Sequence, residues 1–482
     1  MAIFAVHLVL RIPLLFIRAP FFDELFSVWI AREDPSTILR LLRFDSGPPL
    51  YYFILHAFRQ ILYRGPALID AVDAARFVSL AASVVALLLV MAARPLGESR
   101  WIAALLLALL PSHVYFSTEA RAYAVCALFV GVASLLLMHF LETGDSRGLL
   151  LGCASLVVAA YTHYYGVLFF PLPLVLTVIR RRQSLVPGVL GSAGCGLAYI
   201  PGFLLASEQP AQAIAWLAAT APQGIHIVGS IVRQLGFAVP YPGNFLDSPP
   251  LWLQAASLLI TIGVLSYGSI GSSRARILAA ITLCPVIVLL LLSALRGTVY
   301  FPFRFESVLA VPFTLWFAVA LERSPRRFRS LVLGVVLVIA SFVSYSAILE
   351  SARRPPDPFR QAAIFARERV PSTATIVATG PSYLELTCHR KPSWSPRLAA
   401  WPRAQAEHPG WRPFVLNSDL RKELTALPRD FFWVGETVSE EYRVLTQVAQ
   451  MEPRFVNGPL MVARVQLGAR RRPVAPQVPG RQ

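Results

Sequence analysis

Long apolar runs follow one another along the first 350 residues of the chain, separated by short polar junctions. Several of these runs are shorter than the roughly 20 residues that a straight helix needs to cross a bilayer, so we expect 11 to 13 membrane-spanning helices. The pattern predicts a polytopic α-helical membrane protein. The runs are 2–18, 49–63, 72–93, 101–118, 122–141, 148–162, 164–180, 185–206, 250–270, 277–295, 301–321 and 330–349.

Two polar segments between the runs are long enough to form surfaces of their own, 19–48 and 207–249. The first is amphipathic, with Leu25, Phe26 and Ile30 followed by the apolar positions of 38–42. Such a pattern predicts short helices that lie on the membrane surface. Residues 1–350 therefore form the predicted transmembrane module, and these two segments are its predicted outer loops.

Beyond residue 350, short strand-like stretches alternate with helix-like ones, which predicts a small α/β domain over 356–467. The helix-like stretches are 359–369, 418–426 and 439–451, and the strand-like ones are 374–379, 413–416, 431–434 and 460–465. We expect residues 468–482, rich in arginine and proline, to be disordered.

Composition agrees with a membrane protein: 56% of the residues are hydrophobic and 15% are charged, against about 25% charged in soluble domains. This balance excludes an ordinary soluble domain and a disordered chain. A net charge of +17 would suggest nucleic acid in a soluble protein, but here the arginines stand between apolar runs, so we expect no nucleic-acid partner. All but two of the 44 basic residues are arginine, which indicates a GC-rich bacterial genome. For a polytopic protein of a bacterium we expect a place in the inner membrane.

The arginine clusters also predict the orientation, because positive charge marks cytoplasmic loops. The clusters are 180–182, 274–276 and 323–329. With these inside, the segment 207–249 and the C-terminal domain face outward. An inside N-terminus then requires an odd number of spans, and the short run 49–63 is the first candidate not to cross.

An acidic pair, Asp23-Glu24, opens the first outer loop directly after the first run. A carboxylate at a bilayer edge costs several kcal/mol when it is desolvated without a partner, which favours a function, although simple solvation in a loop is the alternative. The segment Asp45 to Tyr52 closes the same loop, and Pro48-Pro49 fixes how the next helix begins.

Two further junctions carry polar and aromatic side chains. In Glu119-Ala-Arg121-Ala-Tyr123, the glutamate and the tyrosine are four residues apart and are expected to share a helical face. The alternative is a turn with a solvated charge pair. The other junction contains His163 and Tyr164 among aromatics, and an interfacial anchor is its alternative.

Two arginines are candidates for binding a lipid phosphate, because a planar guanidinium grips two oxygens. Arg304 lies among aromatic residues, and Arg76 opens the third run. A headgroup anchor is the alternative for both, and an ion pair with Glu306 is a further one for Arg304. The histidines His7, His56 and His113 are assigned to packing, and no nucleotide-binding motif is present.

Taken in order, these motifs resemble the GT-C membrane glycosyltransferases, in the family 39-like branch related to protein O-mannosyltransferases and aminoarabinose transferases. The motifs are Asp23-Glu24, Pro48-Pro-Leu-Tyr-Tyr52, Arg76-x-x-Ser79, Glu119-Ala-Arg-Ala-Tyr123 and Thr162-His-Tyr-Tyr-Gly166. The resemblance covers about residues 2–350. Asp357 to Ala363 also resembles the start of the outer domain in this branch.

The resemblance implies transfer of a hexose or pentose from a polyprenyl-phosphate-linked sugar to an acceptor glycan, lipid or protein on the outer face of the bilayer. Asp23 would be the base of an inverting displacement, with Glu24 positioning a substrate. The positive charge that stabilises the leaving phosphate would come from Arg304, Arg76 or Arg121. Glu119, Tyr123, His163 and Tyr164 would line the substrate site, and Pro48, Pro49 and Tyr52 would position the loop.

One position departs from the pattern of the branch. Some relatives bind the lipid phosphate with a lysine just before the second span, where this chain has Gly47, so the phosphate ligand is an arginine or lies elsewhere. No metal cluster is evident in the sequence. A divalent cation held by Asp23, Glu119 and His163 is an open alternative.

Two other classes of function fit part of the pattern. A lipid-linked-sugar flippase or transporter would have as many spans, but would carry its charges at mid-span, not at outer junctions. A non-catalytic assembly protein would use the outer α/β domain to bind a partner.

Overall fold

The computed structural model of the chain describes residues 1–20, 22–62, 71–180, 184–210, 221–237, 251–297, 299–353, 358–388, 397–401 and 419–468. Its contacts divide the chain into two compact units. The first comprises Met1–Pro20 and Ile30–Arg354, and the second comprises Phe21–Trp29 and Pro355–Gln482.

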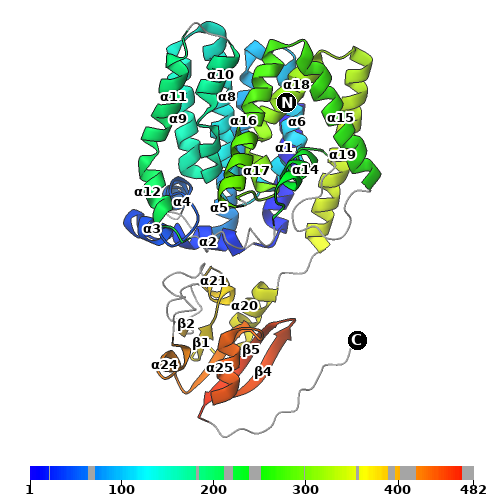
Figure 1. Ribbon diagram of the computed structural model, residues 1–482. Coiled ribbons are helices and arrows are strands. Elements are labelled where there is room, and N and C mark those ends of the chain that lie inside the picture. Colours follow the sequence, from blue (N-terminus) through cyan, green and yellow to red (C-terminus); the bar gives the residue numbers. More distant parts are fainter. Residues whose placement is uncertain are drawn as a thin grey trace. The chain divides into compact units, whose positions relative to one another are not determined.

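The first unit is a bundle of helices that run side by side (Figure 1). Every apolar run predicted from the sequence is helical in it, so the predicted fold class is confirmed. The elements of the bundle are α1 (Ala2–Ile17), α3 (Pro35–Leu42), α4 (Leu50–Leu62), α5 (Ala71–Ala92), η1 (Arg94–Leu96), α6 (Ser99–Leu109), α7 (Pro111–Phe116), α8 (Tyr123–Thr143), α9 (Ser146–Thr162), η2 (Tyr164–Phe169), α10 (Leu172–Ile179), α11 (Val186–Ala198), α12 (Ile200–Glu208), α14 (Ile225–Gln234), α15 (Leu251–Ile270), α16 (Ser273–Arg296), α17 (Arg304–Val308), α18 (Ala310–Glu322) and α19 (Arg326–Arg353).

Four predicted runs are divided between two helices each: α6 and α7, η2 and α10, α11 and α12, and α17 and α18. In the first three pairs a proline occupies one of the first two positions of the second helix. Proline lacks the amide hydrogen that would continue the preceding helix, and it is tolerated in a first turn, so the helix ends and a new one begins there.

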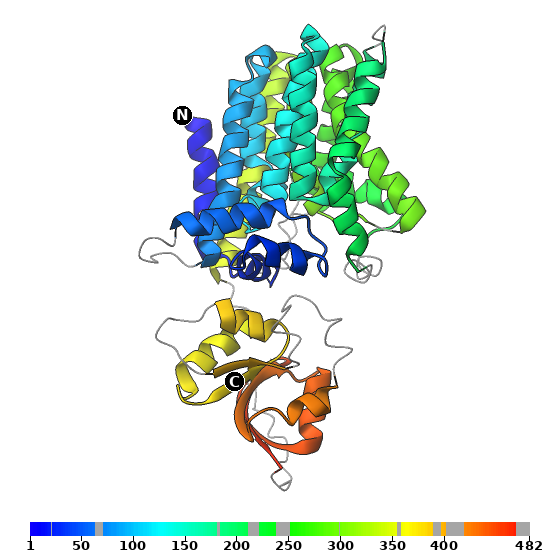
Figure 2. The ribbon, with the colours of Figure 1, turned by 90° about the vertical axis from the view of Figure 1, so that its left-hand side faces the viewer.

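Five of the described helices, α5, α8, α15, α16 and α19, are long and apolar enough to cross a membrane, and the number is up to seven when two bent pairs count as spans. Four shorter stretches are apolar as well: Ser99–Leu109, Ser146–Thr162, Tyr164–Ile179 and Ala310–Glu322. The helix α4 is in neither group, and Figure 2 shows it lying across the ends of its neighbours. The run 49–63, already the doubtful span, therefore lies along the end of the bundle.

Turns that carry arginines gather at one end of the bundle. Arg274 donates from Nε to Glu142 Oε1 at 2.8 Å and from a terminal nitrogen to the Pro95 carbonyl at 2.8 Å. Ser99 donates to Glu322 at the same end. The junctions of the candidate site lie at the opposite end, with α3 and α4 (Figure 1).

Buried polar contacts fix the first helix in the bundle. Arg11 is fully buried and donates to Ser117 Oγ at 2.8 Å and to the Ala108 carbonyl at 2.9 Å, at the end of α6. Ser83 lies 2.9 Å from His7 Nε2 and 3.1 Å from His113 Nε2. These two histidines, predicted to have a packing role, therefore also join α1, α5 and α7 through hydrogen bonds.

The second unit contains a five-stranded sheet in the order β2-β1-β3-β5-β4. The pairs β1–β2 and β1–β3 are parallel, and β3–β5 and β4–β5 are antiparallel. Alternate residues of the sheet contribute to two separate hydrophobic clusters, one with α20 and α21 and one with α24 and α25, so helices cover both faces. The bounds are α2 (Phe22–Ile30), α20 (Pro358–Arg369), β1 (Thr375–Ala378), α21 (Pro381–Cys388), β2 (Arg397–Ala400), α24 (Leu420–Leu424), β3 (Asp430–Glu436), α25 (Glu440–Val448), β4 (Ala449–Asn457) and β5 (Leu460–Leu467).

The predicted α/β alternation is confirmed for α20, β1, α24, β3 and β5, whereas β2, α21 and β4 were not predicted. The helix expected over 439–451 ends at Val448, where the edge strand β4 begins. That strand is polar and contains Pro453 at a register shift, which hid its strand character. The strand expected at 413–416 and the tail 469–482 lie outside the described residues.

Candidate active site

The acidic pair lies in the first turn of α2, as expected for short helices in the first outer loop. Acidic side chains there are favoured by the partial positive charge of a helix N-terminus. Asp23 is partly exposed, Glu24 is fully buried, and the Ser27 hydroxyl donates to the Asp23 carbonyl at 2.8 Å. Consecutive helical residues point about 100° apart, so the two carboxylates have different surroundings and are suited to different roles.

Another carboxylate of the same loop, Asp34, caps α3. Its Oδ1 accepts from the backbone of Ser36 at 3.0 Å and of Thr37 at 3.1 Å. These hydrogen bonds to the charged form hold the pKa of Asp34 well below its usual range. Asp34 is thus committed to the helix cap, and it offers a control for Asp23.

The end of the first loop is tied to two other junctions by Gln209, a residue that the sequence analysis did not select. Its amide nitrogen donates to the carbonyls of Leu42 at 2.7 Å and Gly47 at 3.1 Å. Its amide oxygen accepts from the Tyr164 hydroxyl at 2.7 Å. At the end of the loop, the hydroxyl of Tyr52 in α4 lies 3.4 Å from Asp45 Oδ2, and Pro48-Pro49 directly precedes α4.

Replacing Tyr164 by phenylalanine removes only the hydroxyl that holds Gln209. A hydrogen bond of this kind contributes about 1 kcal/mol, so we expect tryptic cleavage after Arg40 or Arg43 in folded protein to accelerate about fivefold. Tyr161→Phe is the matched control, because that hydroxyl donates to the Ala198 carbonyl, at 3.1 Å. Equal cleavage rates in the two variants would show that Tyr164 does not hold the loop.

An aromatic cluster brings together three of the predicted junctions. The Tyr123 and His163 rings are 4.9 Å apart, and His163 and Tyr165 are 4.7 Å apart. Phe305 meets Tyr165 edge-on at 5.2 Å. The Arg304 guanidinium carbon lies 4.0 Å from the Phe301 ring centre and 5.7 Å from that of Tyr123, within the range of a cation–π contact. The predicted residues Tyr123, His163 and Arg304 therefore share one site.

The backbone just before Arg304 is strained. Phe303 has a φ of 67°, the one non-glycine residue with positive φ in the described part of the chain. Such a conformation costs about 1 kcal/mol or more and persists only where the surroundings enforce it, which is typical of functional sites. Tyr165 contributes to this enforcement, because the Phe301 amide donates to its hydroxyl at 2.9 Å.

A buried acid follows Arg304 by two residues. Glu306 is fully buried, and its Oε1 accepts from the Tyr300 hydroxyl at 2.6 Å. Ser230 Oγ of α14 lies 2.8 Å from the same hydroxyl. The sequence suggested Glu306 as an ion-pair partner of Arg304, whereas in the structure its hydrogen bond comes from Tyr300, whose hydroxyl also meets Ser230, 70 residues away along the chain.

The junction that holds Glu119 and Arg121 is a turn, and α8 begins only at Tyr123. The expected helical face shared by Glu119 and Tyr123 is therefore wrong. The Arg121 amide donates to the Glu119 carbonyl at 2.8 Å, and Ser79 of α5 donates to the Arg121 carbonyl at 3.2 Å. These bonds hold a tight turn, in which Glu119 is buried and Arg121 is partly exposed.

Arg76, a predicted phosphate ligand, has its guanidinium directed at the end of α1. Its terminal nitrogens donate to the carbonyls of Leu15 at 2.6 Å, Arg18 at 3.0 Å and Ala19 at 3.4 Å. One of them also lies 3.4 Å from Asp73 Oδ1. A helix C-terminus leaves carbonyls without partners, and a buried cation satisfies them. This geometry favours an anchor for the segment that leads to Asp23.

We expect Arg76→Gln to destabilise the protein by about 3 kcal/mol, because several buried carbonyls lose a charged donor. The midpoint of thermal unfolding in detergent should fall by roughly 5 °C. Arg40→Gln is the control, since Arg40 is exposed on α3. An unchanged midpoint together with lost donor binding would instead assign Arg76 to the lipid phosphate.

The described residues contain no group of three His, Cys, Asp or Glu side chains that could hold a metal ion. The divalent cation at Asp23, Glu119 and His163 stays a prediction.

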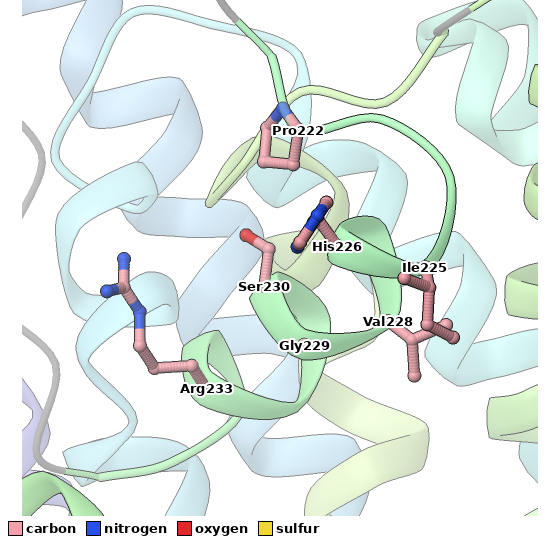
Figure 3. Close-up of a pocket in the computed structure, with 7 residues that line it drawn as sticks. All are labelled: Pro222, Ile225, His226, Val228, Gly229, Ser230 and Arg233. Carbon is pink, nitrogen blue, oxygen red and sulfur yellow. The ribbon is translucent and has the colours of Figure 1, made fainter.

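A pocket adjoins the site on α14, with about 510 Å³ of space (Figure 3). Its described lining is Pro222, Ile225, His226, Val228, Gly229, Ser230 and Arg233. This helix lies in the predicted second outer loop, and none of its polar residues was among the predicted site residues. Two basic side chains seven positions apart on an amphipathic helix, His226 and Arg233, were the signal that could have pointed to it, because residues two turns apart share a face.

No model of a protein family matches the sequence, and no curated protein matches it either. Solved structures do. The crystal structure of ArnT from Cupriavidus metallidurans in the apo state superposes with a TM-score of 0.63 at 13% identity, covering 96% of this chain and 97% of that one. The chain has the GT-C fold.

A second ArnT structure, with undecaprenyl phosphate bound, superposes with a TM-score of 0.60 over the same shares of the two chains, again at 13% identity. The resemblance to GT-C enzymes that the order of the motifs indicated is thus confirmed at the level of the fold. It extends through both compact units, beyond the residues 2–350 on which the motifs relied.

Proposed function

We propose that the chain is a membrane glycosyltransferase that moves a sugar from a polyprenyl-phosphate-linked donor to an acceptor on the outer face of the bacterial inner membrane. The observation that carries this proposal is the correspondence with ArnT along almost the whole of both chains. One of the ArnT structures holds undecaprenyl phosphate, a lipid of the class proposed here as the leaving group.

The proposed reaction is a single displacement. The acceptor hydroxyl attacks the anomeric carbon, the bond from that carbon to the phosphate oxygen breaks, and its electron pair stays on the polyprenyl phosphate. Asp23 takes the hydroxyl proton, which its partial exposure permits. Because one bond forms as the other breaks on the opposite side, the sugar configuration inverts.

Arg304 is the proposed ligand of the leaving phosphate. Its guanidinium lies against Phe301 and Tyr123, whose rings hold it in place and limit its contact with water. A cation placed where negative charge accumulates stabilises the transition state more than the ground state. Arg121, on the neighbouring turn, is the second candidate for this role, and Arg76 is proposed to anchor the loop.

The first experiment follows labelled sugar from polyprenyl-phosphate donors in membranes that contain the protein. We expect label in a glycan, lipid or protein fraction, with release of free polyprenyl phosphate. A flippase would instead move intact donor between leaflets and release no polyprenyl phosphate. The fraction that becomes labelled identifies the class of acceptor.

A further inference from the structure

The pocket on α14 gathers polar groups on one side of the helix. His226, Ser230 and Arg233 are spaced by four and three residues, so they share a face, and Figure 3 shows Ser230 between the other two. Ile225 and Val228 lie on the other side of the helix in the same view. A third face of α14 packs on the bundle through the buried residues Ile227 and Ile231.

The lining of the pocket is suited to an anion. None of its seven described residues is acidic, and two of them are basic or imidazole side chains. Arg233 is exposed and forms no ion pair within the described part of the chain. An arginine fork and an imidazole N–H are donors that bind the oxygens of a phosphate. A volume of about 510 Å³ accommodates such a group with part of the molecule that carries it.

The pocket is connected to the segment that carries Arg304. Ser230 lies 2.8 Å from the Tyr300 hydroxyl, which donates to the buried Glu306 at 2.6 Å. In the described residues Glu306 Oε2 has no hydrogen-bond partner. The strained residue Phe303 and its neighbour Arg304 lie between Tyr300 and Glu306 in the chain. A molecule held at α14 would therefore lie beside the proposed donor site.

We propose that the α14 pocket is a second anion site, which binds a phosphate group of the acceptor and so holds the acceptor beside the donor. The assignment of the bound molecule as the acceptor rests on the proposed transferase function, whereas the anion site itself does not. Arg233 and His226 are the proposed ligands, and the Ser230–Tyr300–Glu306 chain fixes the pocket against the Arg304 segment.

A cysteine at Gly229 tests the pocket directly. A side chain built there meets nothing within 4 Å, so Gly229→Cys places a thiol in the pocket without a clash. The readout is the rate of its modification by an anionic and by a cationic thiol reagent, above the background of the parent protein. Positive potential from Arg233 should favour the anionic reagent, and adding Arg233→Gln should lower the ratio of the two rates about fivefold.

Protection of this thiol then tests binding. The two probes are inorganic phosphate in solution and dioctanoyl phosphatidic acid in nanodiscs of neutral lipid. We expect at least one to slow modification saturably, and this effect to weaken at least fivefold with Arg233→Gln but not with Arg327→Gln, a control that removes an exposed arginine of α19. Protection by both probes supports a site open to soluble phosphates. Protection by the lipid alone supports a headgroup site.

Two results would overturn the anion site: no protection by either probe, or protection that persists unchanged in Arg233→Gln. Protection that persists in Arg233→Gln would show that the phosphate binds at a different site, with Arg304 as the first candidate for its ligand. Because the thiol reaction requires no sugar transfer, a protein that fails the transfer experiment can still pass this one, and the two failures are told apart.

Discussion

Replacing Asp23 by asparagine should lower the rate of sugar transfer by about 10²- to 10⁴-fold, the usual contribution of a general base. The change preserves the shape of the side chain and its place in the first turn of α2, and removes the group that takes the acceptor proton. The measurement is the initial rate of label transfer in membranes with equal amounts of protein. Binding of the donor should change little, because the base acts on the acceptor.

The controls come from the same loop. Asp34→Asn removes the same charge, and asparagine caps a helix as well as aspartate does, so transfer should stay near the wild-type rate. Glu24→Gln should lower the rate less than Asp23→Asn, because Glu24 is fully buried and is proposed to position a substrate. Transfer that survives in Asp23→Asn would contradict the assignment and make Glu24 or Glu119 the next candidate.

Replacing Arg304 by glutamine should lower kcat by about 10²- to 10³-fold, because charge grows on the phosphate oxygen as the bond to the sugar breaks. We also expect a higher KM for the donor, since the ground-state phosphate is already anionic. Arg304→Lys keeps the charge but loses the planar fork and much of the contact with Phe301 and Tyr123. Its kcat should therefore lie between that of the wild type and that of Arg304→Gln.

Arg276→Gln is the control for a lost arginine, because Arg276 is exposed beside Ser272 at the arginine-rich end of the bundle. Steady-state kinetics with varied donor separate the effects on kcat and KM. If Arg304→Gln left both unchanged, the phosphate ligand would have to be sought at Arg121.

The sequence predicts the bundle well because its signal is local. Each span is a continuous apolar stretch, and the prolines that divide α6 from α7 or α11 from α12 stand in the sequence where the helices change. The edge strand β4 is different, since its polar residues and Pro453 are compatible with a strand only because β5 pairs with it. Local preference could not indicate that pairing.

The candidate site follows the same division. Junction motifs identified Tyr123, His163 and Arg304, which the fold brings into one cluster. Contacts between distant segments were invisible to the sequence: Gln209 with Leu42, Ser230 with Tyr300, and Arg76 with the end of α1. An arginine at a membrane junction looks the same in a sequence whether it binds a phosphate or caps a helix. Only its hydrogen-bond partners distinguish the two.

The most direct test of the account uses purified protein in nanodiscs, a labelled polyprenyl-phosphate sugar and an extract of candidate acceptors. Sugar transferred and polyprenyl phosphate released are counted in the same reaction. The account predicts equal amounts of the two, with both lost in Asp23→Asn. The contradicting result is a donor that stays intact and releases no polyprenyl phosphate, although the reaction contains the acceptor fraction that becomes labelled in membranes. That result would exclude a transferase.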